Sequence, residues 1–489
     1  LMSMYNHVFH SPHGVVVKAL LLATVALPLA GSRISANYVV VVSKATRADS
    51  EWHAVVETLV AKYEAASVLE YENSVAECLP KLQEHFPRYV CFVATPSEST
   101  RGFVAQVHRV TRRLDDDPFT DCVWGILTGF DADNALAIAK HKEPLVIRRA
   151  AAGTEIALEK LQEGRWYCEL NQHKMVHKDV SAEPKQEVAP ADTTSSLVDS
   201  LNEYKPDLFV TSGHATERDW QIGYAYRNGY FRSQAGSLFG VDTKSQRMSI
   251  HSPNPKVYLP IGNCLMGHID GTDAMALAWM NSAGVHQMIG YTVLTWYGYA
   301  GWGVLDYFVE QPGRYNFAEA FYANQQALLH RIEKYFPDAV NIELDANGRP
   351  AMPVALTDAA RSAGLSRQDA MGLLYDRDAL AFYGDPAWDA RLADGPLAYD
   401  QRLAVSGGEY TVTISGNEGE RSFEPVNTNG SQRGWRPIVV FLPHRVKDIN
   451  ITDGHDLAPV VTDNFVLIPN PRKYDPLREY RVSFTATRQ

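Results

Sequence analysis

The chain has 489 residues, more than one hydrophobic core usually spans, and at roughly 150 residues per domain we expect about three domains. Hydrophobic residues make up 45% and charged residues 21% of the chain, which excludes a wholly disordered or fibrous protein. The 46 Lys and Arg against 57 Asp and Glu give a formal net charge of −11. This balance argues against nucleic acid as the partner.

The first 36 residues are typical of a signal peptide. Lys18 precedes an apolar run from Ala19 to Ala30, which has the length of a signal-peptide core and is short for a membrane span. Ala30 and Ser32 offer small residues for processing, whereas the polar start and Pro28 leave a buried element as the alternative. We therefore expect bacterial-type export to the periplasm, the cell surface or the medium, and no membrane span in the mature chain.

Residues 37–180 show the pattern of an α/β subdomain. Strand-like runs at Tyr38–Val42 and Tyr89–Ala94 flank an amphipathic helical pattern at Trp52–Tyr63. The strands lack strict polar alternation, which favours a parallel sheet covered on both faces. The polar, Pro-containing stretch 181–196 then predicts a linker.

Residues 197–393 repeat the strand and helix pattern, and the rest of the chain changes character. The expected elements are strands at 207–210, 256–261 and 285–292 and a helix at 272–282. From Asp394 onward, β-branched runs between Gly, Asn and Pro turns predict a C-terminal β-sandwich over 394–489.

Two strand-like runs end in reactive side chains. Leu208–Val210 leads to His214, and Val257–Leu259 leads to Cys264. Active sites of open parallel sheets form at the carboxyl ends of strands, so adjacent strands would bring the two side chains together. A thiol next to an imidazole is a nucleophile with a general base, although a buried Cys and a hydrogen-bonded His explain the same residues.

The order of five sequence blocks resembles the gingipain-like cysteine peptidases, peptidase family C25 of the caspase-like clan. The blocks extend over about Asn37 to Leu392. They are Leu208–Ala215 followed by Trp220, Gly262–Gly267, Pro118–Gly125 with Lys140 downstream, Ala283–Thr292 and Phe382–Pro386.

This resemblance implies a caspase/gingipain-like parallel-sheet sandwich in two α/β subdomains, the second of them catalytic, followed by an immunoglobulin-like β-sandwich. It also implies a cysteine endopeptidase acting on proteins or peptides through a Cys264 thioester. His214 would be the general base and acid, and the N–H groups of Ala215 and Cys264 would form the oxyanion hole. Ile126 replaces an Arg and Ala215 a Gly of the family pattern, and the P1 preference stays open.

Two alternatives share these residues. A transpeptidase would use the same acyl-enzyme with an amine in place of water. A catalytically impaired member would bind a protein or a glycan as a scaffold.

Aromatic residues near the site are candidates for substrate binding. Trp296 and Tyr297 lie in a Gly-rich stretch after a predicted strand, where they either line a pocket or pack the core. An aromatic insertion between His214 and Cys264 could cover the site as a lid or recognise a partner. Its aromatic residues are Trp220, Tyr224, Tyr226, Tyr230 and Phe231.

Metal binding has little support in the sequence. Cys264, His268 and His214 could be imagined as zinc ligands, but no paired zinc motif accompanies them. Asp115–Asp117 reads as a solvated acidic turn, although exported members of the family often carry structural Ca²⁺, for which carboxylates are suitable ligands. We expect no cofactor and no catalytic metal. The oligomeric state stays open.

Overall fold

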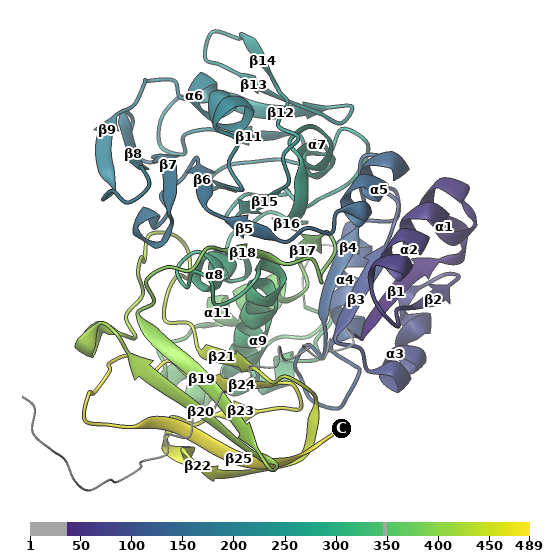
Figure 1. Cartoon of the computed structure of the whole chain (residues 1–489), viewed down its shortest axis with the longest axis vertical. Helices are drawn as coiled ribbons and strands as arrows, with labels where there is room; N and C mark the ends of the chain where they lie inside the picture. The colour runs from purple at the N-terminus through teal and green to yellow at the C-terminus, as the bar shows by residue number, and fades with distance from the viewer. Residues whose placement is uncertain (1–36, 346–349) are drawn as a thin grey trace, which may run out of the picture. The chain divides into compact units, whose positions relative to one another are not determined.

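Aliphatic and β-branched runs form the centre of one 12-stranded sheet (Figure 1). The computed structural model describes residues 37–345 and 350–489, so the signal-like segment 1–36 lies outside the described residues. The strand order is β2-β1-β3-β4-β17-β16-β15-β10-β6-β7-β8-β9. These strands are Tyr38–Ser43 (β1), Ser67–Tyr71 (β2), Tyr89–Val93 (β3), Val123–Leu127 (β4), Arg149–Ala152 (β6), Glu163–Tyr167 (β7), Lys174–Lys178 (β8), Lys185–Val188 (β9), Leu208–Thr211 (β10), Lys256–Pro260 (β15), Val285–Tyr291 (β16) and Leu380–Tyr383 (β17).

The sheet consists of two parallel blocks that run in opposite directions. Strands β1 to β4 and β17 form one block, and β16, β15, β10, β6 and β7 form the other. The blocks meet where β17 pairs antiparallel with β16, and β8 and β9 add an antiparallel edge. A large, mainly parallel sheet in a mixed α/β fold confirms the predicted class.

The stretch 181–196 differs from the linker that its polarity predicts. It contains β9, whose four residues are all exposed, and the first residues of the next helix. A strand at the edge of a sheet with water on both faces needs no apolar residues, so its sequence resembles that of a linker. Strands β6 to β9 precede this stretch in the chain but belong to the same block as β10 and β15.

Helices pack around the sheet. α8 packs against α9 and is buried along its whole length. No helix in the described ranges is both long and apolar enough to cross a membrane. The helices are Lys44–Ala48 (α1), Ser50–Lys62 (α2), Leu79–His85 (α3), Arg101–Thr111 (α4), Ala132–Lys140 (α5), Thr194–Asp199 (α6), Met275–Ser282 (α7), Tyr299–Phe308 (α8), Phe317–Tyr335 (α9), Asp358–Ser362 (α10) and Arg367–Arg377 (α11), with single turns at Val75–Cys78 (η1), Leu158–Lys160 (η2), Ser200–Tyr204 (η3), Pro337–Ala339 (η4), Gly419–Arg421 (η5) and His455–Leu457 (η6).

The aromatic insertion between His214 and Cys264 folds into a separate antiparallel sheet. Its strands are Asp219–Gln221 (β11), Tyr230–Gln234 (β12), Ser237–Val241 (β13) and Arg247–Ile250 (β14). β13 packs against α6 and α7, which makes this sheet an outer layer of the fold (Figure 1). A two-stranded sheet pairs Leu145–Ile147 (β5) with Ala390–Leu392 (β18).

The C-terminal residues form two antiparallel sheets, here called the β domain. One has the order β19-β20-β25-β22 and the other β21-β24-β23. Val412 and Val482 of the first sheet share a buried cluster with Ile438 and Ile468 of the second, which is the arrangement of a sandwich. The immunoglobulin-like assignment stays a prediction. The strands are Tyr399–Ser406 (β19), Glu409–Gly416 (β20), Ile438–Phe441 (β21), Val446–Asp453 (β22), Val460–Val461 (β23), Phe465–Ile468 (β24) and Tyr480–Arg488 (β25).

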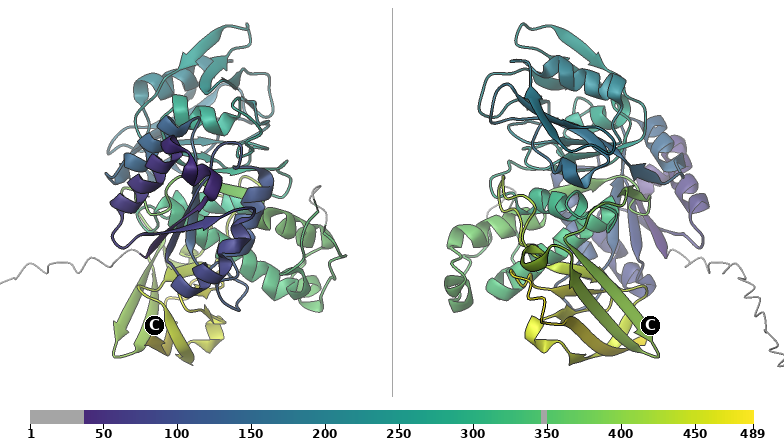
Figure 2. Two further views of the ribbon diagram at one scale, coloured as in Figure 1. Left: turned by 90° about the vertical axis from the view of Figure 1, so that its right-hand side faces the viewer. Right: turned by 60° about the vertical axis from the view of Figure 1, so that its left-hand side comes forward.

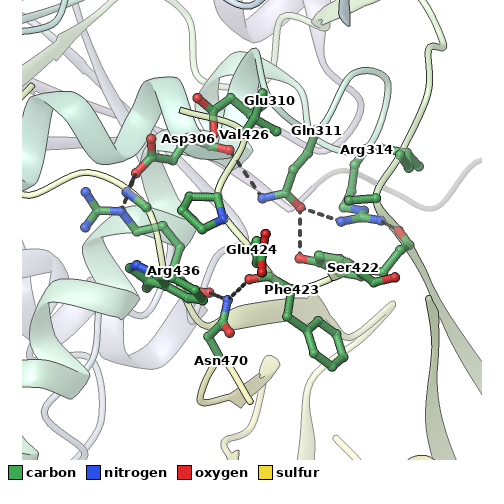
Figure 3. A pocket seen from close by; sticks show the side chains of 16 residues that line it. Asp306, Glu310, Gln311, Arg314, Ser422, Phe423, Glu424, Val426, Arg436 and Asn470 are labelled. Atoms are coloured by element: carbon green, nitrogen blue, oxygen red, sulfur yellow. Dashed lines mark hydrogen bonds and ion pairs between the residues drawn. The ribbon is translucent and has the colours of Figure 1, made fainter. Parts of the chain in front are cut away.

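Buried ion pairs join the β domain to α8. The Asp306 carboxylate accepts hydrogen bonds from Nε of Arg433 (3.2 Å) and from Nε of Arg436 (2.8 Å), and all three side chains are almost fully buried. Figure 3 shows Asp306 and Arg436 at a hollow of about 50 Å³ beside the carboxyl end of α8. In Figure 2 the light-green to yellow strands of the β domain lie together at the bottom of both views.

Candidate active site

The topology brings His214 and Cys264 to the same edge of the sheet. β10 and β15 are adjacent and parallel, with Thr211 opposite Pro260. His214 follows β10 by three residues, and Cys264 follows β15 by four. Both residues therefore emerge at the carboxyl ends of neighbouring strands, which is where the sequence pattern places them.

Asn263 links the two loops from a fully buried position. Its Oδ1 accepts a hydrogen bond from the hydroxyl of Thr211 (2.7 Å), and its Nδ2 donates to the carbonyl oxygen of Gly213 (3.1 Å). The Thr211 hydroxyl also lies 2.9 Å from the Tyr258 hydroxyl. This network fixes the residue before His214 relative to the residue before Cys264.

The Cys264 thiol lies against the loop that follows β16. The backbone N–H of Thr295 donates to Sγ at 3.2 Å, and Sγ lies 3.8 Å from the carbonyl oxygen of the same residue. The next residue, Leu265, has a left-handed backbone with φ of 56°, and its N–H donates to the carbonyl of Val293. Such a conformation is strained for a residue with a side chain, which marks a turn that the surrounding contacts hold in place.

His214 is exposed and stacked on one aromatic ring. Gly213 before it has φ of 97°, a conformation that favours glycine. The imidazole and the Tyr224 ring lie 4.6 Å apart at an interplanar angle of 26°. Within the described residues, the imidazole and the Cys264 thiol form no hydrogen bond with each other.

Two backbone N–H groups near the reactive residues are free to donate. Ala215 forms an antiparallel β-bridge with Trp220, but neither of these two residues makes the hydrogen bonds of the bridge. The residues on either side make them, from the Gln221 N–H to the His214 carbonyl and from the Thr216 N–H to the Asp219 carbonyl. Among the residues that the structure describes, neither the Ala215 N–H nor the Cys264 N–H has an acceptor.

The three aromatic residues expected to bind substrate lie in different environments. Trp296 is 46% exposed and is available for contact. Tyr297 is buried, and its hydroxyl donates to Asp369 (3.1 Å). Trp220 is 0% exposed and donates from Nε1 to the Ser212 carbonyl (2.8 Å), so its predicted role in substrate binding is wrong. It packs the core because it is the inward residue of β11, whereas Tyr224 from the same insertion reaches the site.

All five cysteines are free thiols, and Cys264 is the most accessible of them. Burial raises the pKa of Cys78 to about 11, and it raises the pKa values of Cys91 and Cys122 further. Alkylation at neutral pH should therefore distinguish Cys264 from these three.

The described residues bring one group of potential metal ligands within 4.8 Å of one another, namely Asp115, Asp117 and Asp121. Burial, with the neighbouring carboxylates, raises the pKa of Asp117 to about 7 and that of Asp121 to about 9. Two of these residues belong to the predicted acidic turn. Asp270, which follows Cys264 in the chain, accepts two hydrogen bonds of 2.6 and 2.9 Å from Arg218.

Sequence reasoning missed Asn263 and Thr295 at the site. Asn263 stands directly before Cys264, and a buried amide next to a predicted nucleophile is a usable signal. Thr295 contacts Sγ only because β16 lies next to β15, a pairing that local sequence does not reveal.

No family model matches the chain, and no curated protein matches it. Among solved structures, the chain is similar to that of the Arg-specific cysteine proteinase gingipain R, with 11% sequence identity, coverage of 90% of this chain and 92% of that chain, and a TM-score of 0.44. It is similar to the complex of the pro- and mature domains of Porphyromonas gingivalis RgpB, with 11% identity, coverage of 89% and 93%, and a TM-score of 0.42. A third similar structure, described as a protease, has 10% identity, coverage of 90% and 92%, and a TM-score of 0.41. Gingipains are also the proteins that the sequence blocks resemble.

Proposed function

We propose that the protein is a cysteine peptidase with Cys264 as the nucleophile and His214 as the general base and acid. The observation that carries this proposal is the position of both side chains at the carboxyl ends of adjacent parallel strands, next to two free backbone N–H groups. A nucleophile, a base and oxyanion donors are the parts that acyl transfer requires.

The proposed reaction has two steps. The imidazole of His214 takes the thiol proton while Cys264 Sγ bonds to the substrate carbonyl carbon, and the N–H groups of Ala215 and Cys264 stabilise the oxyanion. The C–N bond breaks as His214 returns the proton to the leaving amine, which leaves a thioester. Water, deprotonated by His214, then attacks the thioester, and the acid product leaves as the thiol reforms.

Several features of the site support this assignment. The Thr295 N–H directed at Sγ is suited to a sulfur atom that carries negative charge. The Tyr224 ring restricts the orientation of the imidazole. Hydrogen bonds between catalytic groups are often long in free enzymes and tighten when substrate binds, so the absence of a His214–Cys264 bond in the described residues is compatible with catalysis.

The substrate would be a protein or a peptide, and water is the default acceptor. An amine acceptor would make the enzyme a transpeptidase without any change in its first step. Export rests on residues 1–36 and stays a prediction.

The rate of iodoacetamide labelling at each cysteine tests the proposal. We expect Cys264 to label fast below pH 7 in the parent and slowly in His214→Ala, with the labelled sites located by mass spectrometry. The buried cysteines serve as internal references in the same sample. If Cys264 labelling rises only near pH 8.5 in both proteins, the peptidase assignment fails and a binding scaffold becomes the better hypothesis.

A further inference from the structure

One short segment of the β domain lies next to the candidate active site. This segment, Asn427–Ser431, is here called the strap. It consists of small and polar residues, and its residues from Thr428 to Ser431 are exposed. It lies about 160 residues beyond Cys264 in the chain, so any role at the site follows from the fold rather than from local sequence.

The first contact of the strap is with the loop after β6. Nδ2 of Asn427 donates to Oε1 of Glu155 (3.2 Å), and Nδ2 of Asn429 donates to Oε2 of the same carboxylate (3.4 Å). β6 pairs in parallel with β10, so Glu155 emerges at the same sheet edge as His214. The strap is therefore attached to the edge of the sheet that carries the site.

The second contact is with Trp302 at the start of α8. Gly430 has φ of 122° and lies so close to the indole that a Cβ there would stand 2.8 Å from three ring atoms. A Cβ on Gly262, two residues before Cys264, would stand 3.2 Å from Nε1 of the same ring. Trp302 is therefore in contact with both the strap and the turn that carries the nucleophile.

A buried ion pair holds the strap in place. Arg433, two residues beyond the strap, donates from Nη1 to the carbonyl of Asn429 (2.9 Å) and from Nε to Asp306 (3.2 Å), and it also pairs with Glu310. The Arg433 side chain is 3% exposed. Breaking such a pair is costly because it leaves a buried charge without its partner. The strap is therefore held in one position and does not open and close over the site.

The strap also borders a hollow of about 380 Å³. Asn427 and Thr428 line it together with Glu155, Glu159 and Trp166. This volume is within the range of ligand pockets. In the described part of the chain, the main-chain N–H and C=O groups of Thr428 and Gly430 have no hydrogen-bond partner, so they are free to pair with another extended chain.

We propose that the strap is part of the substrate-binding surface and contacts an extended polypeptide. The main chain of the polypeptide would pair with Thr428 and Gly430, and one of its side chains would enter the hollow beside Glu155. This inference rests on the proposed function, because it adds a wall from the β domain to the cleft of the same peptidase site.

Photo-crosslinking to the full chain carrying Cys264→Ala tests the contact without catalysis. The probe is a pool of random decapeptides, each with a benzophenone group and a fluorescein label. We expect crosslinks at residues 427–431, located by mass spectrometry. Asn427→Ala/Asn429→Ala should weaken decapeptide binding about tenfold, because it removes the two amides that orient the Glu155 carboxylate beside the hollow, while Arg433 still holds the strap. The control Asn417→Ala removes an exposed amide that binds the Leu397 carbonyl and should leave binding unchanged.

Kinetic measurements on proteins that keep Cys264 separate this inference from the proposed function. The double variant should raise KM for decapeptides about tenfold and leave KM for a capped dipeptide and the melting temperature unchanged. Crosslinks confined to other regions, or equal decapeptide binding by the double variant and the control, would overturn the role of the strap. If decapeptide binding depends on the strap but the parent hydrolyses no peptide, the peptidase proposal is refuted and the role of the strap is retained. If the parent hydrolyses decapeptides with a KM that the double variant leaves unchanged, the peptidase proposal is retained and the role of the strap is refuted.

Discussion

Replacing Asn263 by Leu should damage the fold moderately and the reaction strongly. Leu has nearly the shape of Asn, so the variant removes two hydrogen bonds and creates little cavity. The carbonyl of Gly213 loses its donor inside the protein, while the Thr211 hydroxyl keeps Tyr258. The Gly213 carbonyl is only partly buried, so its loss of a donor costs at most the about 1–3 kcal/mol of a buried carbonyl. With about 1 kcal/mol for a lost neutral hydrogen bond, the free energy of unfolding should fall by about 1–4 kcal/mol.

The same substitution releases Gly213, which positions His214. A displacement of about 1 Å in a catalytic group can cost about 10²-fold in rate, so we expect kcat/KM for peptide hydrolysis to fall by about that factor. Urea unfolding measures the first quantity and a fluorogenic peptide assay at a temperature where the variant is fully folded measures the second.

Gln287→Met provides the matched control for Asn263→Leu. Gln287 is also fully buried and donates to two carbonyls, those of Asp385 (2.7 Å) and Trp388 (3.1 Å), but it lies in the first half of β16. It should lose similar stability and keep kcat/KM within about threefold when folded. Equal losses of activity in the two variants, or unchanged activity in Asn263→Leu, would refute the positioning argument.

Three further predictions concern buried and stacked rings. His108 is fully buried, which lowers its pKa from 6.5 to about 4. Between pH 6.5 and pH 4 the unfolded chain therefore binds a proton that the folded chain does not. As the pH falls through this window, the free energy of unfolding should decrease by up to about 3 kcal/mol. Urea titrations should show a weaker pH dependence for His108→Gln, and equal slopes would contradict the assignment. Tyr224→Leu removes the aromatic ring that stacks on His214 and should lower kcat/KM about 3- to 10-fold with little change in melting temperature. Tyr224→Phe keeps the ring and should retain the parent rate. Equal losses of kcat/KM in both variants would exclude stacking as the cause. Trp220→Ala should cost about 3–5 kcal/mol of stability by urea unfolding, and a stable variant with selectively weakened substrate binding would restore Trp220 as a substrate contact.

The local pattern was sufficient to predict the strands that carry the site. β10, β15 and β16 are short apolar runs with clear ends, so their carboxyl ends and the two reactive residues that follow could be read from the sequence. The α/β class and the all-β character of the C-terminal residues have the same basis, because helical and strand periodicities differ.

Pairing between distant segments could not be predicted in this way. The polarity of β9 indicated a linker because an edge strand has no buried face. Trp220 and Tyr224 are both aromatic, and composition did not separate them. The alternation Asp219-Trp220-Gln221 does contain the signal, since polar residues on both sides mark Trp220 as the inward position of a strand.

The position of β17 has a consequence for how the protein is made. This strand begins 253 residues after β4 ends, yet it lies between β4 and β16 and joins the two parallel blocks. During synthesis, β4 and β16 therefore each leave the ribosome with one edge unpaired. The sheet becomes continuous only after Leu380–Tyr383 has been synthesised and has paired with both strands. A chain that stops before residue 380 would expose two hydrophobic strand edges, so truncation there should give aggregation and not a soluble half.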